Sequence, residues 1–522
     1  MKHSPSTATH RGPALKRHPA ASVRKVFPCV NTFSVTLISE RPSSCSTPVQ
    51  PSQTSPVACI TLSGARTQFS LTVNLFHPKS SPAREDISLM NIEPRTLSFT
   101  LLLVSCCLPP TLSLAQPMPA PSRMPAANAE SVGMSSDGLN RIGELMQKHI
   151  DAGHIQGAVT IVARRGKVVH FSTHGKMDVE QGRAMEPDAI FRMASSTKPV
   201  LGVAAMMMIE EGKLSPSDPV SKYIPEFADM KVAVLAEPAD RDVSPSWVNP
   251  KGDVPDHRLV PVNTPITIHH LLTHTSGLKS GGLGSAVDSV TRRKDDTLAT
   301  YIPKLAKVPL DFQPGTRWSY SPGTGLDVVA RIIEIVSETP FDEFLRKRIF
   351  DPLEMNNSYF NLPSDKESKR VVISGSDKWE KLKGWGPTKY VSASGGLSSA
   401  AEDYLHFEQM LLGGGELFGH RLLRAESVKR MSSNQVDDLY SGLTGRKKGR
   451  QGMGFGYTVA VTLNPDAAEN NRGKGAFGWG GAFGTQSWTD PERELVAVLM
   501  LQQPHGPTQR DIGEAVQQAI ID

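Results

Sequence analysis

The chain has 522 residues, of which 39% are hydrophobic and 21% charged, and its formal net charge is +5. This ordinary globular balance excludes a collagen-like chain, a multi-span membrane protein and a wholly disordered chain. Residues 1–89 contain ten Lys and Arg but three acidic residues, a net of +7, so the other 433 residues sum to −2. The body of the chain therefore lacks the basic charge that nucleic acids bind, and we expect no nucleic-acid partner.

Residues 1–89 are rich in Ser, Thr and Pro, and their apolar residues follow no sustained period. Such a composition predicts disorder. We interpret this stretch as an extension read from a start codon upstream of the true one, Met90. A genuine extended leader is the alternative.

Residues 90–115 resemble a secretory signal peptide in an internal position. A short polar start leads into the mostly apolar residues 96–114, and small residues stand at Ser113 and Ala115. This pattern predicts cleavage after Ala115 and export by a bacterial cell, to the periplasm or the medium.

A lipobox-like segment at residues 103–106 gives the alternative, a lipid anchor on Cys106. Pro109 and Pro110 interrupt the apolar run, so we expect no stable membrane span. All five cysteines precede residue 108, which leaves the rest of the chain without a disulfide framework, a Cys-ligated zinc or a cysteine nucleophile.

After a Pro/Ala-rich linker at 116–130, we interpret residues 131–522 as one hydrolase domain. Apolar spacing predicts helices and β-rich runs predict strands. The predicted elements are a helix at 136–152, a hairpin of strands at 157–163 and 168–172, a buried helix at 198–211, helical patches at 267–273, 296–306 and 325–349, strands at 456–462, 475–479, 483–489 and 494–501, and a helix at 508–521.

Strands at both ends with helices between them predict an α/β fold of the α+β type. One antiparallel sheet, made by the N- and C-terminal parts, would be flanked by helices and would carry an inserted, mainly helical domain at about 214–390.

Three motifs are candidates for chemistry. In the first, Ser195 and Lys198 share one face at the start of an apolar helix, whose free N–H groups favour an oxyanion. Burial at this position would favour the neutral amine of Lys198, which takes a proton from serine. Taken alone, Ser195 would also suit a helix N-cap and Lys198 a surface lysine.

In the second motif, Tyr320 lies in a Gly/Pro-containing turn ahead of a helix, where its phenol would relay a proton beside a lysine or simply pack. The third motif runs from Phe477 through Trp479, Gly480, Gly481 and Ala482. Its glycines let another backbone or a ligand approach closely, or they mark a β-bulge.

Two other patterns are set aside. His270 and His274 have the i, i+4 spacing of a zincin, but Leu271 stands where the catalytic Glu would be. The glycines of residues 452–456 lead into a strand rather than a helix and so do not form a dinucleotide loop. We expect neither a metal nor a cofactor.

The order and spacing of the three motifs resemble the serine β-lactamase and penicillin-binding-protein superfamily. The resemblance covers about residues 130–520 and is closest to family VIII carboxylesterases, on the class C β-lactamase branch. Further matching segments lie at 268–278, 350–355, 395–399 and 401–404.

The resemblance implies Ser195 as the acylated nucleophile and Lys198 with Tyr320 as the acid–base pair. It also implies the backbone N–H groups of Ser195 and Ala482 as the oxyanion hole.

Two departures from class C β-lactamases concern substrate binding. Pro322 replaces an Asn, and Trp479-Gly480-Gly481 replaces Lys-Thr-Gly, which removes a charge that would hold a carboxylate. The resemblance therefore implies a small-molecule ester substrate. The alternatives are a D-amino-acid peptidase or D,D-carboxypeptidase, a weak β-lactamase, or a non-catalytic cell-wall sensor.

Overall fold

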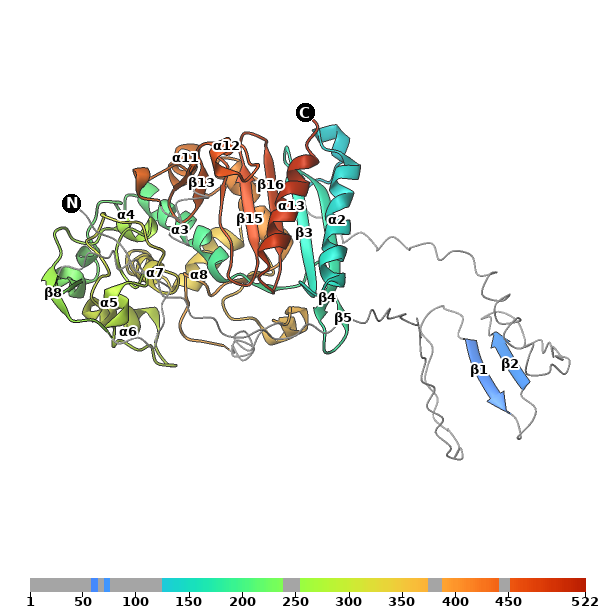
Figure 1. The fold of residues 1–522 in the computed structure, drawn as a ribbon, viewed down its shortest axis with the longest axis horizontal. Coiled ribbons are helices and arrows are strands. Elements are labelled where there is room, and N and C mark those ends of the chain that lie inside the picture. Colours follow the sequence, from blue (N-terminus) through green and yellow to red (C-terminus); the bar gives the residue numbers. More distant parts are fainter. Residues whose placement is uncertain (1–57, 64–69, 76–123, 238–253, 374–386, 441–450) are drawn as a thin grey trace, which may run out of the picture. The chain divides into compact units, whose positions relative to one another are not determined.

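The computed structural model describes residues 58–63, 70–75, 124–237, 254–373, 387–440 and 451–522 (Figure 1). The chain divides into two compact units, residues 1–114 and residues 115–522. In the first unit, strands β1 (Ala58–Ser63) and β2 (Ser70–Leu75) pair in antiparallel fashion.

The predicted signal peptide and Cys106 lie outside the described residues. Among the helices that the structure describes, none has both the length and the apolar character needed to span a bilayer.

The second unit is built around an eight-stranded antiparallel sheet with the order β12-β13-β14-β15-β16-β3-β4-β5. The strands are β3 (Gly157–Arg164), β4 (Lys167–Asp178), β5 (Arg183–Ala184), β12 (Met453–Phe455), β13 (Ala460–Thr462), β14 (Phe477–Gly478), β15 (Gln486–Asp490) and β16 (Leu495–Met500). Strand β16 pairs with β3 from Leu495 opposite Arg164 to Met500 opposite Val159. The two ends of the chain thus form one sheet, which confirms the predicted architecture.

The predicted hairpin of strands at 157–163 and 168–172 is present, and the last two predicted strands also form a hairpin. Strands β3 and β4 are joined by Arg165 and Gly166, whose φ angles of 51° and 72° are the left-handed pair that a two-residue type I′ turn requires. Strands β15 and β16 are joined by residues 491–494, and Glu494 adopts a φ of 50°.

One face of the sheet is covered by helices α2 (Ser136–Asp151) and α13 (Gly506–Gln518), which lie side by side (Figure 1). Ser135 caps α2 by accepting the N–H of Gly138 over 3.1 Å. Alternate side chains of the strands face these helices and are buried with them; this cluster includes Ala158, Val162, Trp488 and Leu499 of the sheet and Ile142, Met146, Ile512 and Val516 of the helices.

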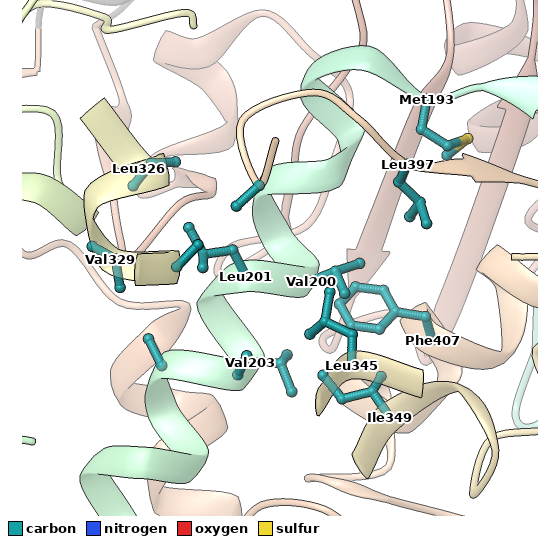
Figure 2. Packing of buried hydrophobic residues seen from close by; sticks show 14 of the residues in the cluster. Met193, Val200, Leu201, Val203, Leu326, Val329, Leu345, Ile349, Leu397 and Phe407 are labelled. Carbon is teal, nitrogen blue, oxygen red and sulfur yellow. The ribbon is translucent and has the colours of Figure 1, made fainter. Parts of the chain in front are cut away.

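The opposite face carries helices α3 (Lys198–Glu210) and α10 (Ala401–Leu412), whose apolar side chains are buried with Val159 and Ile161 of β3. Every residue of α3 from Lys198 to Met208 is buried. In Figure 2, Leu201 faces Leu326 and Val329 of α7 (Gly325–Ser337), while Val200 lies beside Phe407 of α10. The apolar sequence predicts this burial on all sides, and the burial of each large apolar side chain stabilises the fold by about 1.5–3 kcal/mol.

The insert contains the predicted helices together with a hairpin that the sequence reading missed. Its helices are α4 (Ile268–Leu272), α5 (Leu283–Ala286), α6 (Leu298–Tyr301), α7 (Gly325–Ser337) and α8 (Phe341–Leu345), and its hairpin pairs β7 (Lys231–Leu235) with β8 (His257–Pro261). The shorter turns include 3-10 segments at Val220–Lys222, Pro225–Asp229 and Ile302–Lys307 and a π-helical turn at Arg346–Phe350.

A short pairing outside the main sheet positions the start of α3. Strand β6 (Phe191–Arg192) pairs with β9 (Ser398–Ser399), which places the segment before Ser195 next to the segment that leads into α10. The remaining elements near the sheet are β10 (Glu416–Leu417), β11 (His420–Arg421), α11 (Ala425–Met431) and α12 (Pro465–Ala468).

Candidate active site

Ser195 and Lys198 lie where a 3-10 turn, η2 (Ala194–Thr197), continues into α3. The Lys198 ammonium donates to Ser195 Oγ over 3.2 Å. Ala194, directly before the serine, adopts a φ of 45°, which is rare for a residue other than glycine and costs about 1–3 kcal/mol. The fold therefore maintains a strained backbone at this point, as is common where a reactive side chain is positioned.

Tyr320 reaches the same serine from the turn before α7. Its phenol donates to Ser195 Oγ over 2.7 Å, and the indole N–H of Trp479 approaches the phenol oxygen at 3.4 Å. The Lys198 Nζ lies 5.0 Å from the centroid of the Tyr320 ring. The first two motifs of the sequence thus meet at one hydroxyl, and Trp479 of the third motif adjoins them.

Lys198 is fully buried and each of its N–H groups has an acceptor. Besides Ser195 Oγ, it donates to the carbonyl of Pro322 over 2.9 Å and to the carbonyl of Ser394 over 2.6 Å. The two backbone carbonyls hold the Lys198 amine in an orientation in which its third N–H points to Ser195 Oγ. Pro322, which the sequence reading placed against substrate, contacts the lysine through its backbone and is itself exposed.

Asp327, on the first turn of α7, is a site residue that the sequence reading missed. Its buried carboxylate accepts the backbone N–H of Ser394 over 2.7 Å and the phenol of Tyr390 over 2.8 Å, and Ser392 Oγ lies 3.2 Å away. Asp327 therefore holds, through its N–H, the residue whose carbonyl accepts from Lys198.

Burial raises the pKa of Asp327, and the hydrogen bonds from Tyr390 and Ser394 and the positive charge of Lys198 oppose this effect. In the sequence, Asp327 looked like an ordinary acidic residue at a helix start. No spacing pattern indicated its partner at Ser394, 67 residues away.

The two histidines considered as a zincin pair are engaged separately. His270 Nδ1 accepts the backbone N–H of Thr267 in the capping box of α4. His274 lies with its ring centroid 4.8 Å from that of Tyr320, and its Nδ1 accepts the N–H of Ser321 over 3.3 Å. Burial, and then the charge of Lys198, lower the pKa of His274 well below its ordinary value, so it packs against the site as a neutral ring.

The third motif turns directly beside the serine. A Cβ on Gly481 would lie 2.2 Å from the carbonyl oxygen of Met193, so only glycine fits at this close approach. Thr485 Oγ1 donates to the same carbonyl over 3.2 Å and hydrogen-bonds with Ser196 Oγ over 2.9 Å. These contacts fix the turn at residues 481–484 against the nucleophile segment.

The two amides assigned to the oxyanion hole belong to these adjoining segments. The turn closes with the N–H of Gly484 donating to the carbonyl of Gly481 over 2.9 Å, which leaves Ala482 at the exposed corner. Within the described part of the chain, no backbone carbonyl accepts from the amide of Ser195 or of Ala482.

An aromatic cluster forms one wall of the site. Its members are Trp318, Tyr320, Tyr440, Phe455 and Trp479. The Trp479 ring centroid lies 5.5 Å from that of Tyr320 and 5.4 Å from that of Phe455, and the residue is 9% exposed. Trp479 thus presents an apolar edge where a lysine would present a charge.

Together these groups can perform acyl transfer. A hydroxyl lies within hydrogen-bonding distance of both a lysine and a tyrosine, and this combines a nucleophile with proton carriers.

Comparison with known proteins identifies the family of the chain. The family model described as Beta-lactamase matches residues 142–520. Protein Rv1367c of Mycobacterium tuberculosis (strain ATCC 25618 / H37Rv) is 32% identical over 376 residues, covering 67% of this chain and 87% of that protein. Esterase EstB of Burkholderia gladioli is 27% identical over 413 residues, covering 72% of this chain and 94% of EstB.

Among solved structures, EstCE1, a hydrolase with promiscuous acyltransferase activity, matches with a TM-score of 0.57 and 24% identity. The match covers 73% of this chain and 99% of EstCE1, and it shows that the fold is shared. With the family match extending over most of the chain, this protein belongs to the beta-lactamase family and is a serine hydrolase of that family.

Proposed function

We propose that the protein hydrolyses small esters through an acyl-enzyme on Ser195. The observation that carries the proposal is the convergence of Lys198 and Tyr320 on one serine hydroxyl, at 3.2 and 2.7 Å. The similarity to esterase EstB supports the ester as the substrate class.

In the first half of the reaction, Ser195 Oγ bonds to the ester carbonyl carbon. Its proton passes to the pair formed by Lys198 and Tyr320. One of these two side chains must therefore be deprotonated when the reaction begins. The carbonyl oxygen becomes an oxyanion and accepts from the amides of Ser195 and Ala482. When the C–O bond of the ester breaks, the pair returns the proton to the leaving alcohol.

In the second half, water attacks the acyl-enzyme carbonyl and gives its proton to the same pair. Collapse of the tetrahedral intermediate breaks the bond to Ser195 Oγ, which takes the proton back, and the carboxylic acid leaves. Neither half needs a metal or a cofactor.

Trp479, Gly480 and Gly481 are proposed to contact the substrate from the segment that directly follows strand β14. Because Trp479 belongs to a buried aromatic cluster and offers no charge, this wall suits an apolar acyl or alcohol group. Pro322 stands where class C β-lactamases have Asn, so it offers the substrate no side-chain amide. Its presence therefore favours an ester over a substrate that must be held by hydrogen bonds.

A fluorophosphonate probe tests the nucleophile, because this reagent needs an activated hydroxyl. We expect one labelled peptide, containing Ser195, and loss of both labelling and p-nitrophenyl ester hydrolysis in Ser195→Ala. Labelling that persists in this variant would place the nucleophile elsewhere. Slow acylation without turnover would instead favour a cell-wall sensor.

We further propose that the protein is exported. The support is the signal-like sequence at 90–115 and the absence of cysteine from the 415 residues after Cys107. N-terminal sequencing of protein from the native cell should begin at Gln116, and peptides from residues 1–89 would contradict the proposed start. A lipid on Cys106 would replace cleavage after Ala115 with an anchored form.

A further inference from the structure

Three histidines that are far apart in the sequence meet on the face of the sheet opposite Ser195. They are His149 in the last turn of α2, His154 just after that helix, and His505 at the N-terminus of α13. One ring nitrogen from each lies within 4.8 Å of the other two. We call this group the histidine cluster, and we propose that it binds a divalent transition-metal ion of the zinc class.

The end of α2 holds the first two histidines in a fixed relation. Gly153 adopts a φ of 70°, and the N–H of His154 donates to the carbonyl of His149 over 2.9 Å while that of Gly153 donates to Ile150 over 2.9 Å. This is the Schellman pattern of helix termination, which depends on the left-handed glycine. It brings His149 Nδ1 and His154 Nδ1 to 3.0 Å of each other.

That separation suits two ligands of one ion. Two nitrogens bound tetrahedrally to zinc at 2.0–2.1 Å lie about 3.3 Å apart, so an ion fits between them after a small side-chain movement. In the neutral state without metal, one of the two Nδ1 atoms must carry a hydrogen to bond to the other, whereas a metal ion would accept both lone pairs.

Asp511 on α13 sets the tautomer of His149. Its Oδ2 lies 3.0 Å from His149 Nε2, so the Nε2–H of neutral imidazole donates to the carboxylate and the Nδ1 lone pair faces His154. A carboxylate behind a ligating histidine in this way orients the ring and increases its basicity.

His505 completes the set from the cap of α13. Its Nδ1 caps α13 by accepting the N–H of Thr508 over 3.3 Å and lies 2.8 Å from Thr508 Oγ1. Binding a metal through Nε2 requires the other tautomer, in which Nδ1–H donates to the Thr508 hydroxyl and the longer cap bond is given up. The rings of His154 and His505 stack with centroids 4.4 Å apart.

His149 is buried, His505 is half-buried and His154 is exposed, so an ion can enter from solvent and retain water at a fourth position. Three imidazoles suit Zn²⁺, Ni²⁺ or Cu²⁺ and disfavour Ca²⁺ and Mg²⁺, which prefer oxygen. A bound ion would connect the end of α2 to the start of α13. It would stabilise the fold without entering the reaction, because the cluster and Ser195 lie on opposite faces of the sheet.

The test uses the full chain, purified with a tag that lacks histidine and stripped of metal. Equilibrium dialysis with Zn²⁺ should give one ion that is lost from His154→Gln, with micromolar or tighter affinity in the parent chain. Saturating Zn²⁺ should raise the parent Tm by about 3 °C at 100 times Kd and should leave that of His154→Gln unchanged. Co²⁺ should give the strong visible bands of a tetrahedral nitrogen site.

His154 is chosen for substitution because it is exposed and its replacement spares the core. His420→Gln, an exposed histidine on β11, is the matched control and should bind as the parent chain does. Asp511→Asn should weaken binding about 10- to 100-fold. Equal Zn²⁺ affinity in His154→Gln and the parent chain, or no stoichiometric Zn²⁺ in the parent chain, would overturn the proposal.

Discussion

Tyr320 donates its phenolic hydrogen to Ser195 Oγ over 2.7 Å, across 125 residues of sequence. Lys198 reaches the same oxygen from one helical turn away, so the serine has two proton partners on different elements. The phenol and the amine therefore have separable roles, which substitution can resolve.

Replacing Tyr320 with Phe should lower kcat about 10²- to 10⁴-fold while changing KM little, because the ring and its packing remain and the proton relay is lost. Lys198→Ala should cause a loss of the same order. Steady-state kinetics on a short p-nitrophenyl ester measure both. Nearly full activity in Tyr320→Phe would make the phenol structural and exclude the relay.

Asp327 is expected to act as a positioning residue through Ser394. Asp327→Asn weakens the carboxylate's hold on the Ser394 amide, so the carbonyl that orients Lys198 shifts. We expect kcat and the rate of fluorophosphonate labelling to fall about 10- to 100-fold, with KM nearly unchanged. Ser392→Ala, which removes one hydroxyl with contacts of 3.3 and 3.2 Å to the two oxygens of the same carboxylate, is the matched control and should remain within about twofold. An unchanged labelling rate in Asp327→Asn would contradict this role.

Substrate preference should follow the missing charge at Trp479. Binding a penicillin or a peptide C-terminus requires a partner for a carboxylate, and loss of such a buried partner costs about 2–5 kcal/mol. We expect kcat/KM for a short p-nitrophenyl ester to exceed that for a chromogenic cephalosporin by at least about 10²-fold. Trp479→Lys should not improve ester turnover.

The charge of Arg472 could bind a substrate carboxylate in place of the missing lysine if it reached the site, and this would weaken the expected preference for esters. Its guanidinium lies 4.6 Å from the ring centroid of Trp488, which faces α2 and α13 rather than the aromatic cluster. The parallel assay should include a D-Ala-D-Ala peptide. Cephalosporin turnover equal to ester turnover would favour the β-lactamase alternative, and faster peptide turnover the D,D-carboxypeptidase.

Acid should destabilise the fold through His170. Burial, and then the nearby His174, lower the pKa of His170 from 6.5 to about 3. The unfolded chain therefore takes up this proton at a higher pH than the folded chain, and stability falls as pH drops below 6.5. The expected loss from this group between pH 7 and pH 5 is about 2 kcal/mol.

Urea unfolding at the two pH values measures this effect. His170→Gln retains a hydrogen-bonding side chain for Thr160, whose Oγ1 lies 2.8 Å from His170 Nε2, but it cannot titrate. Between pH 7 and pH 5, the free energy of unfolding of the variant should therefore fall by about 2 kcal/mol less than that of the parent chain. Equal losses in the two proteins would show that His170 does not carry the acid sensitivity.

Elements with local signals could be predicted from the amino-acid sequence. The apolar character of residues 200–209 predicted the buried helix α3, and the turn residues around Arg165 and Gly166 predicted the hairpin that the structure contains. The sheet built from both chain ends also followed from the order of elements. Three motifs pointed to Ser195, Lys198 and Tyr320 because each has a characteristic spacing or neighbour.

Only the tertiary structure decided which groups meet. Asp327 and Ser394 are joined by one hydrogen bond between distant segments. Pro322 contacts Lys198 through its backbone carbonyl, a group that every residue has and that no sequence pattern can therefore single out. The histidine cluster likewise depends on α2 and α13 packing side by side, which brings His505 to His149 across more than 350 residues. Periodicity reports local conformation and burial, whereas such contacts arise from long-range packing that no short pattern encodes.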